Sequence, residues 1–176
     1  MRLPLVPGLA LSLLLGSCVP NGSKSNNPQP SVLTQYRPVL MSRTQLETAV
    51  AGLPPRALQV PGKIFAGNRY LFVNEQYQGI HVFDNADPTH PAAVAFLRIP
   101  GNLDLAVRGT LLYADNGPDL LTLDISDPTR MQVLSRTREA LPEVQPPLRN
   151  LVLPAQYQPA NRPAGSVVVG WEKIKP

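Results

Sequence analysis

The sequence contains a single cysteine, two histidines and one tryptophan among its 176 residues, and aromatic residues make up only 6%. One thiol, that of Cys18, cannot form a disulfide within the chain. The two histidines, His81 and His90, are separated by a turn and have no further cysteines beside them, which is poor spacing for a closed zinc site. No Gly-x-Ser-x-Gly sequence and no glycine-rich phosphate loop is present. The sequence therefore predicts no catalytic residues, no metal and no cofactor.

Acidic residues are scarce between residues 19 and 74, and they outnumber basic residues between 75 and 143. Residues 19–74 hold six basic and one acidic residue, whereas residues 75–143 hold five basic and ten acidic residues. The formal net charge is +4, but the basic residues stand singly and are not interleaved with aromatics. That pattern predicts no nucleic-acid partner. The basic stretch could face anionic lipid headgroups or could be an ordinary solvated surface.

The first residues, MRLPLVPGLALSLLLGSC, have the layout of a secretory signal peptide. Arg2 precedes an apolar run from Leu5 to Leu15 that is too short to span a bilayer. The four residues ending at Cys18, Leu-Gly-Ser-Cys, resemble the bacterial lipobox, in which signal peptidase cuts before a cysteine whose sulfur carries a diacylglyceryl group. We therefore expect a lipoprotein signal peptide at residues 1–17 and lipidation at Cys18; the alternative is an ordinary signal peptide with an incidental cysteine. Val19 in place of aspartate resembles the enterobacterial sorting pattern for the outer membrane, facing the periplasm.

The residues after Cys18 divide into a polar stretch and a segment with one helix. Residues 18–35 are rich in Asn, Ser and Pro, have little apolar content up to about Pro30, and are predicted to be a flexible tether. Within residues 36–61, Thr44 and Glu47 fit a capping box, and a proline pair at 54–55 ends the apolar pattern. This predicts one short helix at about 44–51, covering an edge or an end of the following domain.

Two similar units of about forty residues follow, at 62–101 and 102–141. Each offers four short apolar or alternating runs, which predict strands at 63–67, 70–74, 79–84 and 92–99, and at 103–109, 110–115, 119–125 and 131–137. Superposing the units without gaps gives seven identities: Ala66/Ala106, Leu71/Leu111, Asp84/Asp124, Asp87/Asp127, Pro88/Pro128, Thr89/Thr129 and Arg98/Arg138. A forty-residue period with four strands per unit predicts an all-β fold of propeller-like blades.

The motif Asp-x-x-Asp-Pro-Thr stands between the third and fourth predicted strand of each unit. Aspartate side chains accept hydrogen bonds from backbone N–H groups just downstream, and proline fixes φ, so Asp84, Asp87, Pro88, Asp124, Asp127 and Pro128 are predicted to be structural turn residues. The alternative, calcium binding, calls for about six to eight oxygen ligands and usually a denser acidic loop. The turn is the favoured interpretation.

The stretches GIHVFDNADPTHP and LLTLDISDPTRM resemble LVIVD repeats, the blades of secreted bacterial β-propellers. The likeness covers roughly residues 36–172 and implies an uncharacterised bacterial lipoprotein family that has no established catalytic residues. A closed propeller uses about four to eight blades, and only two repeats are clear. Residues 142–176 are expected to hold a partial third repeat or closing strands near 149–153 and 166–172. Three interpretations stay open: a truncated propeller, closure by the two flanking segments, or self-association through exposed blade edges.

Aromatic residues in polar loops are the remaining candidates for a binding site. Tyr77 and Tyr157 stand beside Gln and Asn and are candidate contacts for a glycan or a protein, or else lie flat on their own domain. Trp171 is expected to anchor a core or an edge, His81 to be half-buried on its strand and His90 to be exposed. The predicted function is a lipid-anchored envelope binding or scaffold module without activity of its own. The alternatives are an envelope hydrolase, or an accessory subunit of one, acting on polysaccharide, and an inactive remnant.

Overall fold

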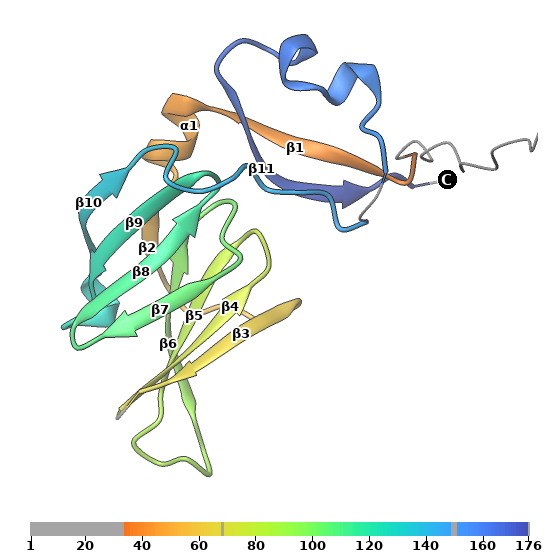
Figure 1. The fold of residues 1–176 in the computed structure, drawn as a ribbon. Helices are drawn as coiled ribbons and strands as arrows, with labels where there is room; N and C mark the ends of the chain where they lie inside the picture. Colours follow the sequence, from red (N-terminus) through yellow and green to blue (C-terminus); the bar gives the residue numbers. More distant parts are fainter. Residues whose placement is uncertain (1–33, 68, 149–150, 176) are drawn as a thin grey trace, which may run out of the picture.

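The computed structural model describes residues 34–67, 69–148 and 151–175, so the predicted signal peptide and Cys18 lie outside the described residues. The described part forms three antiparallel sheets and one α-helix, which confirms the predicted mostly-β class (Figure 1). A first sheet has the strand order β2-β6-β5-β4-β3, a second sheet has the order β10-β9-β8-β7, and β1 pairs with β11 in a two-stranded ribbon. The described sheets do not close into a barrel or a propeller ring. No helix within these ranges is long and apolar enough to cross a membrane.

Each of the eight strand segments predicted from the two repeats overlaps an observed strand, with bounds that differ by at most two residues. The first repeat forms β3 (Pro61–Ala66), β4 (Tyr70–Glu75), β5 (Gly79–Asp84) and β6 (Ala92–Arg98). The second repeat forms β7 (Leu105–Arg108), β8 (Leu111–Asn116), β9 (Asp119–Asp124) and β10 (Gln132–Thr137). Consecutive strands pair within each repeat, so each repeat is an antiparallel meander.

The main core lies between the first and second sheets. Residues two apart on a strand share a face, and on β8 the buried Leu112 and Ala114 alternate with the partly exposed Tyr113 and Asp115. The buried set from both sheets forms one cluster: Phe72, Ile80, Val82, Ala95 and Leu97 from the first, and Leu105, Leu112, Ala114, Leu121 and Leu123 from the second. Each sheet therefore has one face on this core and one face turned outward.

The Asp-x-x-Asp-Pro-Thr connectors have the same hydrogen bonds in both repeats. In the first, the Asp84 carboxylate accepts from the Ala86 N–H at 3.0 Å and Asp87 accepts from the Thr89 N–H at 2.9 Å. In the second, Asp124 accepts from the Ser126 N–H at 2.8 Å and Asp127 accepts from the Thr129 N–H at 3.0 Å. Pro128 opens a one-turn 3-10 helix, η1 (Pro128–Arg130). These bonds reverse the chain between the third and fourth strand of each repeat.

The ungapped superposition of the two repeats is wrong in their first two strands. Phe65 pairs with Phe72 in the first sheet, and Ala106 pairs with Tyr113 in the second. Ala106 therefore corresponds to Phe65 and not to Ala66, and Leu111 likewise does not correspond to Leu71. The cause is the hairpin tip between the second and third strands, which has three residues after Glu75 in the first repeat but two after Asn116 in the second.

Beyond that hairpin the forty-residue offset holds. Val82 pairs with Ala95 in the first sheet, as Thr122 pairs with Ser135 in the second. A one-residue slip moves side chains to the opposite face of a strand, so the correspondence of faces follows from the pairing and not from the identities. The core-facing side of the first sheet, with Phe72 and Val82, corresponds to the outward side of the second sheet, with Tyr113 and Thr122.

The N-terminal segment contains two strands that the sequence did not predict. They are β1 (Tyr36–Ser42) and β2 (Ala51–Leu53), and β2 extends the first sheet by pairing with β6. The helix between them, α1 (Arg43–Thr48), begins one residue earlier than predicted and ends three residues earlier. The predicted cap at Thr44 is wrong: Ser42 is the N-cap, accepting from the Gln45 N–H, while the Gln45 side chain accepts from the Ser42 N–H at 2.8 Å. Two overlapping capping patterns are present, and the extended backbone at the end of β1 selects the first.

The C-terminal segment provides one strand and not a third repeat. The strand β11 (Ser166–Lys173) confirms the prediction near 166–172 and pairs with β1 along its length. The strand predicted near 149–153 is wrong for the residues described there, because 151–153 form only an isolated bridge at Val152. Two 3-10 turns, η2 (Ala155–Tyr157) and η3 (Pro159–Asn161), lead into β11. The ribbon of β1 and β11 thus joins the two flanking segments of the chain.

Candidate functional site

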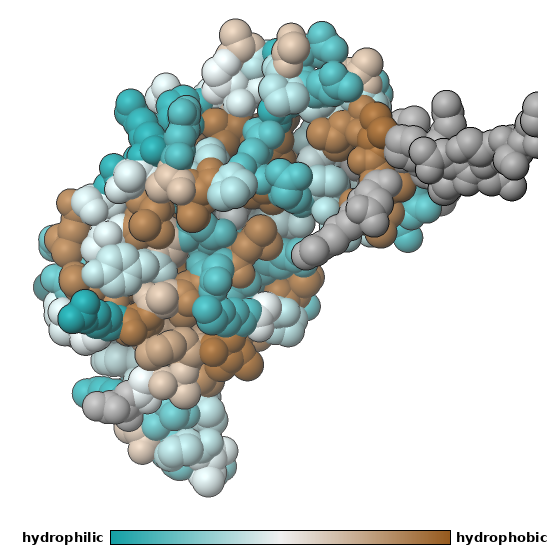
Figure 2. All heavy atoms as spheres, viewed as in Figure 1, coloured by the Kyte–Doolittle hydropathy of each residue, from teal (hydrophilic) through white to brown (hydrophobic). Residues whose placement is uncertain are grey.

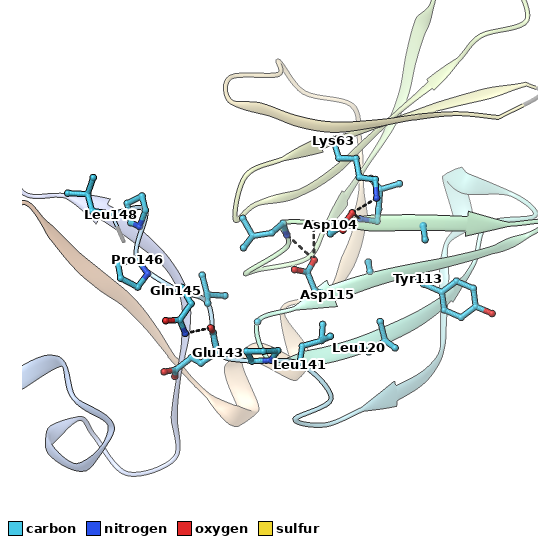
Figure 3. Close-up of a pocket in the computed structure, with 18 of the residues that line it drawn as sticks. Lys63, Asp104, Tyr113, Asp115, Leu120, Leu141, Glu143, Gln145, Pro146 and Leu148 are labelled. Atoms are coloured by element: carbon cyan, nitrogen blue, oxygen red, sulfur yellow. Dashed lines mark hydrogen bonds and ion pairs between the residues drawn. The ribbon is translucent and has the colours of Figure 1, made fainter. Parts of the chain in front are cut away.

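A groove of about 930 Å³ lies between the outward face of the second sheet and the segment 141–148 (Figure 3). One wall consists of side chains from three neighbouring strands, Ala106 of β7, Tyr113 of β8 and Leu120 of β9. The opposite rim carries Leu141, Pro146 and Leu148. Figure 2 shows apolar side chains reaching the surface among polar ones on the side of the molecule seen in Figure 1. A concave, mostly apolar surface with few polar groups is typical of a binding site.

A carboxylate at the base of the groove holds the loop that joins the two repeats. Asp115 Oδ1 accepts from the Leu103 N–H at 2.9 Å, the Asp104 N–H at 3.0 Å and Asn102 Nδ2 at 2.7 Å. Burial raises the pKa of Asp115, and these hydrogen bonds only partly offset that effect. Lys63 Nζ lies 2.6 Å from Asp104 Oδ1 and so ties β3 to the same loop.

The segment 141–148 is held in place from behind. Arg162 forms two hydrogen bonds to the Glu143 carboxylate, at 2.8 and 3.0 Å, and its side chain is only 6% exposed. The Trp171 indole N–H donates to the Val144 carbonyl at 2.9 Å. A bidentate ion pair and a buried indole hydrogen bond restrict this rim, so the groove is preformed.

The outward face of the first sheet is covered by residues 54–60, which we call the strap. The Arg56 guanidinium lies 4.0 Å from the ring centre of Phe96, and its Nη2 lies 2.6 Å from Glu75 Oε2. Glu75 also accepts from the Gln59 N–H at 3.1 Å and lies 2.7 Å from His81 Nε2. Burial raises the pKa of Glu75, but the bonds from His81 and Gln59 and the charge of Arg56 outweigh it, so the net pKa is lowered. The two outward faces therefore differ: one is closed by the strap and the other forms the groove.

Sequence reasoning missed both carboxylates. Glu75 is the last residue of β4 and Asp115 is the last but one of β8, and each accepts backbone N–H groups from the segment that precedes the first strand of its repeat. The sequence did offer a signal: acidic residues stand forty positions apart, at 75 and 115, just before the hairpin between the second and third strands of each repeat. Because the hairpins differ by one residue, the pairing makes Asp115 the counterpart of Asn74, so the two carboxylates lie on opposite faces of their sheets.

The structure brings neither predicted tyrosine into the groove. Tyr77 adopts a left-handed φ of 64°, and its ring lies against Gly170 of β11. Burial raises the pKa of the Tyr77 hydroxyl. Tyr157 is also half-buried and packs with Tyr77 around a second cluster of Val144, Val168 and Trp171. Trp171 is buried, as expected, and both tyrosine rings pack on their own protein.

The remaining predicted residues lie apart from the groove. His81 is only 1% exposed, which corrects the expectation of a half-buried side chain, because Phe96, Phe83 and Glu75 surround it. His90 is exposed at the first connector and lies 3.1 Å from Asp87. Among the described residues, no three His, Cys, Asp or Glu side chains come together as metal ligands.

No protein-family model, curated protein or solved structure matches the chain. The resemblance to LVIVD-repeat lipoproteins therefore stays a prediction. The chemistry of the groove follows from its lining alone, in which the described residues include no serine, threonine, cysteine or histidine. The polar side chains of the lining are instead those of Lys63, Tyr113, Gln145, Asp104, Asp115 and Glu143. The arrangement supplies a rigid apolar wall, a tyrosine and carboxylates at the rim.

Proposed function

We propose that this protein is a lipid-anchored binding module of the bacterial cell envelope and that the groove is its binding surface. The proposed location is the outer membrane, on the side that faces the periplasm. The observation that carries the proposal is the groove itself: a preformed apolar wall on a rigid sheet, with Asp115 at its base and Asp104 and Glu143 also in its lining. The anchor is proposed at Cys18, on the basis of the lipobox-like residues before it.

The two repeats are proposed to be propeller-type blades. Each is a four-stranded antiparallel meander, and the two pack face to face through one apolar cluster. The first strands of the two repeats are joined by the ion pair between Lys63 on β3 and Asp104 before β7. Side-by-side first strands and stacked faces are the arrangement of neighbouring blades around a propeller axis. The groove would then be the face on which a further blade packs.

An envelope hydrolase acting on polysaccharide is a second candidate, and one observation favours it. Asp115 lies in a groove that also holds Asp104 and Glu143, burial raises its pKa, and a pair of carboxyl groups of which one has a raised pKa is the arrangement that glycoside hydrolysis uses. Against this, three donors bind Asp115 Oδ1, which favours a structural role for this carboxylate in holding the loop between the repeats. Screening the purified chain on glycosidic and ester substrates tests this, with Asp115→Asn as the variant, since an amide oxygen can still accept from the loop. Turnover that Asp115→Asn abolishes in a folded protein would establish the hydrolase.

The anchor is tested by comparing the full-length chain with Cys18→Ser. We expect labelled palmitate to enter the full-length chain and not the variant, and the variant to leave the membrane fraction, because two or more acyl chains give stable attachment. A variant that stays membrane-bound would contradict the anchor.

The binding surface is tested with a photo-crosslinking amino acid in place of Tyr113, in cells that make the full-length chain. Thr89, at the exposed tip of the first connector, provides the matched control position. We expect a discrete crosslinked product from position 113 and none from position 89. The absence of a product at 113, or the same products at both positions, would contradict the assignment of the groove.

A further inference from the structure

We propose that the groove receives the strap-covered face of a second copy of this chain, so that copies associate head to tail. The inference names the partner of the binding surface proposed above and rests on that function. It follows from the correspondence of faces between the two repeats and from the apolar side chains exposed on the strap and on β3.

The face of the second repeat that forms the groove wall has a counterpart in the first repeat, and that counterpart packs on another sheet. Its residues Ala106, Tyr113 and Leu120 correspond to Phe65, Phe72 and Ile80 of the first sheet by the strand pairing. In the first repeat this face packs against the second sheet and belongs to the core or borders it. The same face of the second repeat is open, so the intramolecular contact between the repeats shows what kind of layer fits there.

The matching layer of a second copy can be named by the same correspondence. The face of the second sheet that packs on the first includes Ala114 and Leu121. Their counterparts in the first repeat are Val73 and His81, on the face that the strap covers. A second copy that repeated the contact would therefore bring its strap, with the sheet beneath, to the groove.

The strap side of the first sheet exposes more apolar surface than a free surface needs. Leu58 and Val60 on the strap are 37% and 53% exposed, and Ile64, on the adjoining strand β3, is 60% exposed. Three large aliphatic side chains lie within seven residues and beside the cation Arg56. Exposed aliphatic side chains that gather on one side of a sheet are a candidate interaction surface.

The correspondence of faces makes the contact head to tail and not symmetric. The groove of one copy meets the strap-covered face of the other, and the two surfaces are different. The charged groups are already paired within each copy: Lys63 with Asp104 and Arg162 with Glu143 at the groove, and Arg56 with Glu75 under the strap. The contact therefore depends on shape and apolar side chains. Each copy then keeps one groove and one strap, and such heterologous contacts close into a ring or continue as a filament.

The experiment measures mass in solution by light scattering over a range of concentrations, using the full-length chain with Cys18→Ser so that the anchor is absent. Ala106→Arg places a bulky cation in the groove at an exposed position. Val60→Glu places a carboxylate on the strap. We expect the parent to be larger than a monomer and each variant alone to be a monomer.

Mixing the two variants decides the symmetry. One partner keeps an intact strap and the other keeps an intact groove, so an equimolar mixture should form a one-to-one dimer and nothing larger. The matched control is Val133→Glu at the outer edge of the second sheet, where Val133 is 45% exposed, and it should leave the parent's mass unchanged. Circular dichroism checks each fold, and Leu103→Arg, at another exposed groove position, replaces Ala106→Arg if that variant loses structure.

Three results would overturn the inference: a monomeric parent at every concentration, no dimer on mixing, or dissociation caused by Val133→Glu alone. The crosslinking at Tyr113 separates this failure from that of the proposed function. A product of twice the chain's mass supports the second copy. A product with another envelope component, from a monomeric parent, overturns the inference but leaves the proposed binding surface standing.

Discussion

A buried carboxylate on β9, that of Asp119, links α1 to β10 through two arginines. Asp119, at the start of β9, has a fully buried side chain and accepts from Arg43 at 2.7 and 2.8 Å and from Arg136 at 2.7 Å. The Glu139 N–H donates to the same carboxylate at 3.1 Å. Burial raises the pKa of Asp119, but the hydrogen bonds from Arg43 and Arg136 outweigh it and the net pKa is lowered.

We expect Asp119→Asn to destabilise the protein by about 3 kcal/mol. Removing one partner of a buried ion pair costs roughly 3 to 5 kcal/mol, because the opposite charge is left buried without compensation. The lower end applies here, since 27% of the Arg43 side chain and 15% of the Arg136 side chain are exposed and can recover some hydration. For a protein of this size the melting temperature should fall by roughly 6 to 12 °C.

Urea unfolding followed by circular dichroism measures this loss, and the m-value should stay unchanged. Glu172→Gln is the matched control, because its ion pair with Arg37 is half exposed on both sides and such pairs contribute about 0 to 1 kcal/mol. If Asp119→Asn lost no more than the control, the Asp119 cluster would not be a buried, compensated charge and the reasoning would be refuted.

Three further predictions concern the backbone, pH and the helix cap. Gly79→Ala should prevent folding or cost several kcal/mol, since φ is 142° and an added Cβ would collide with the Leu97 carbonyl oxygen, whereas Gly52→Ala, with open space around it, should be tolerated; thermal melts compare the two. The folded-state pKa values of Glu75 and Asp119 are lowered. The stability that these two groups contribute is therefore present above their unfolded-state pKa values of about 4 and is lost as the pH falls through the folded-state values. Urea unfolding below about pH 4 should show this decline in stability, and an equally steep decline in Asp119→Asn would contradict the contribution of Asp119. Ser42→Ala should lose about 1 kcal/mol as the N-cap and Thr44→Ala clearly less, and equal losses would contradict the assigned cap.

The strands and the connectors were predictable because their signals are local. Alternating apolar residues between turn residues located all eight strands of the repeats. The aspartates of the connectors, such as Asp84 and Asp124, bond to N–H groups only two residues away. An interaction that is closed within a few residues is visible in the sequence.

The start of the helix and the alignment of the two repeats were predicted less well, because in each case the sequence offers two similar local patterns. Ser42 and Thr44 both begin a capping pattern, and the pairing of β1 with β11 decided between them by ending the strand at Ser42. The identities Ala66/Ala106 and Leu71/Leu111 suggested an unbroken alignment. Strand pairing shows a hairpin shorter by one residue, which no ungapped comparison detects.

By itself the sequence determined the β class, the two repeats and their turns, because these follow from side-chain periodicity and from contacts within a few residues. The tertiary structure alone decided which face of each sheet is covered. Glu75 meets Arg56 nineteen residues away, and Asp119 meets Arg43 seventy-six residues away. The groove likewise needs the 141–148 segment to be held by Arg162 and Trp171. Such contacts depend on how the sheets and the ribbon pack, and they place one closed and one open face on the same molecule.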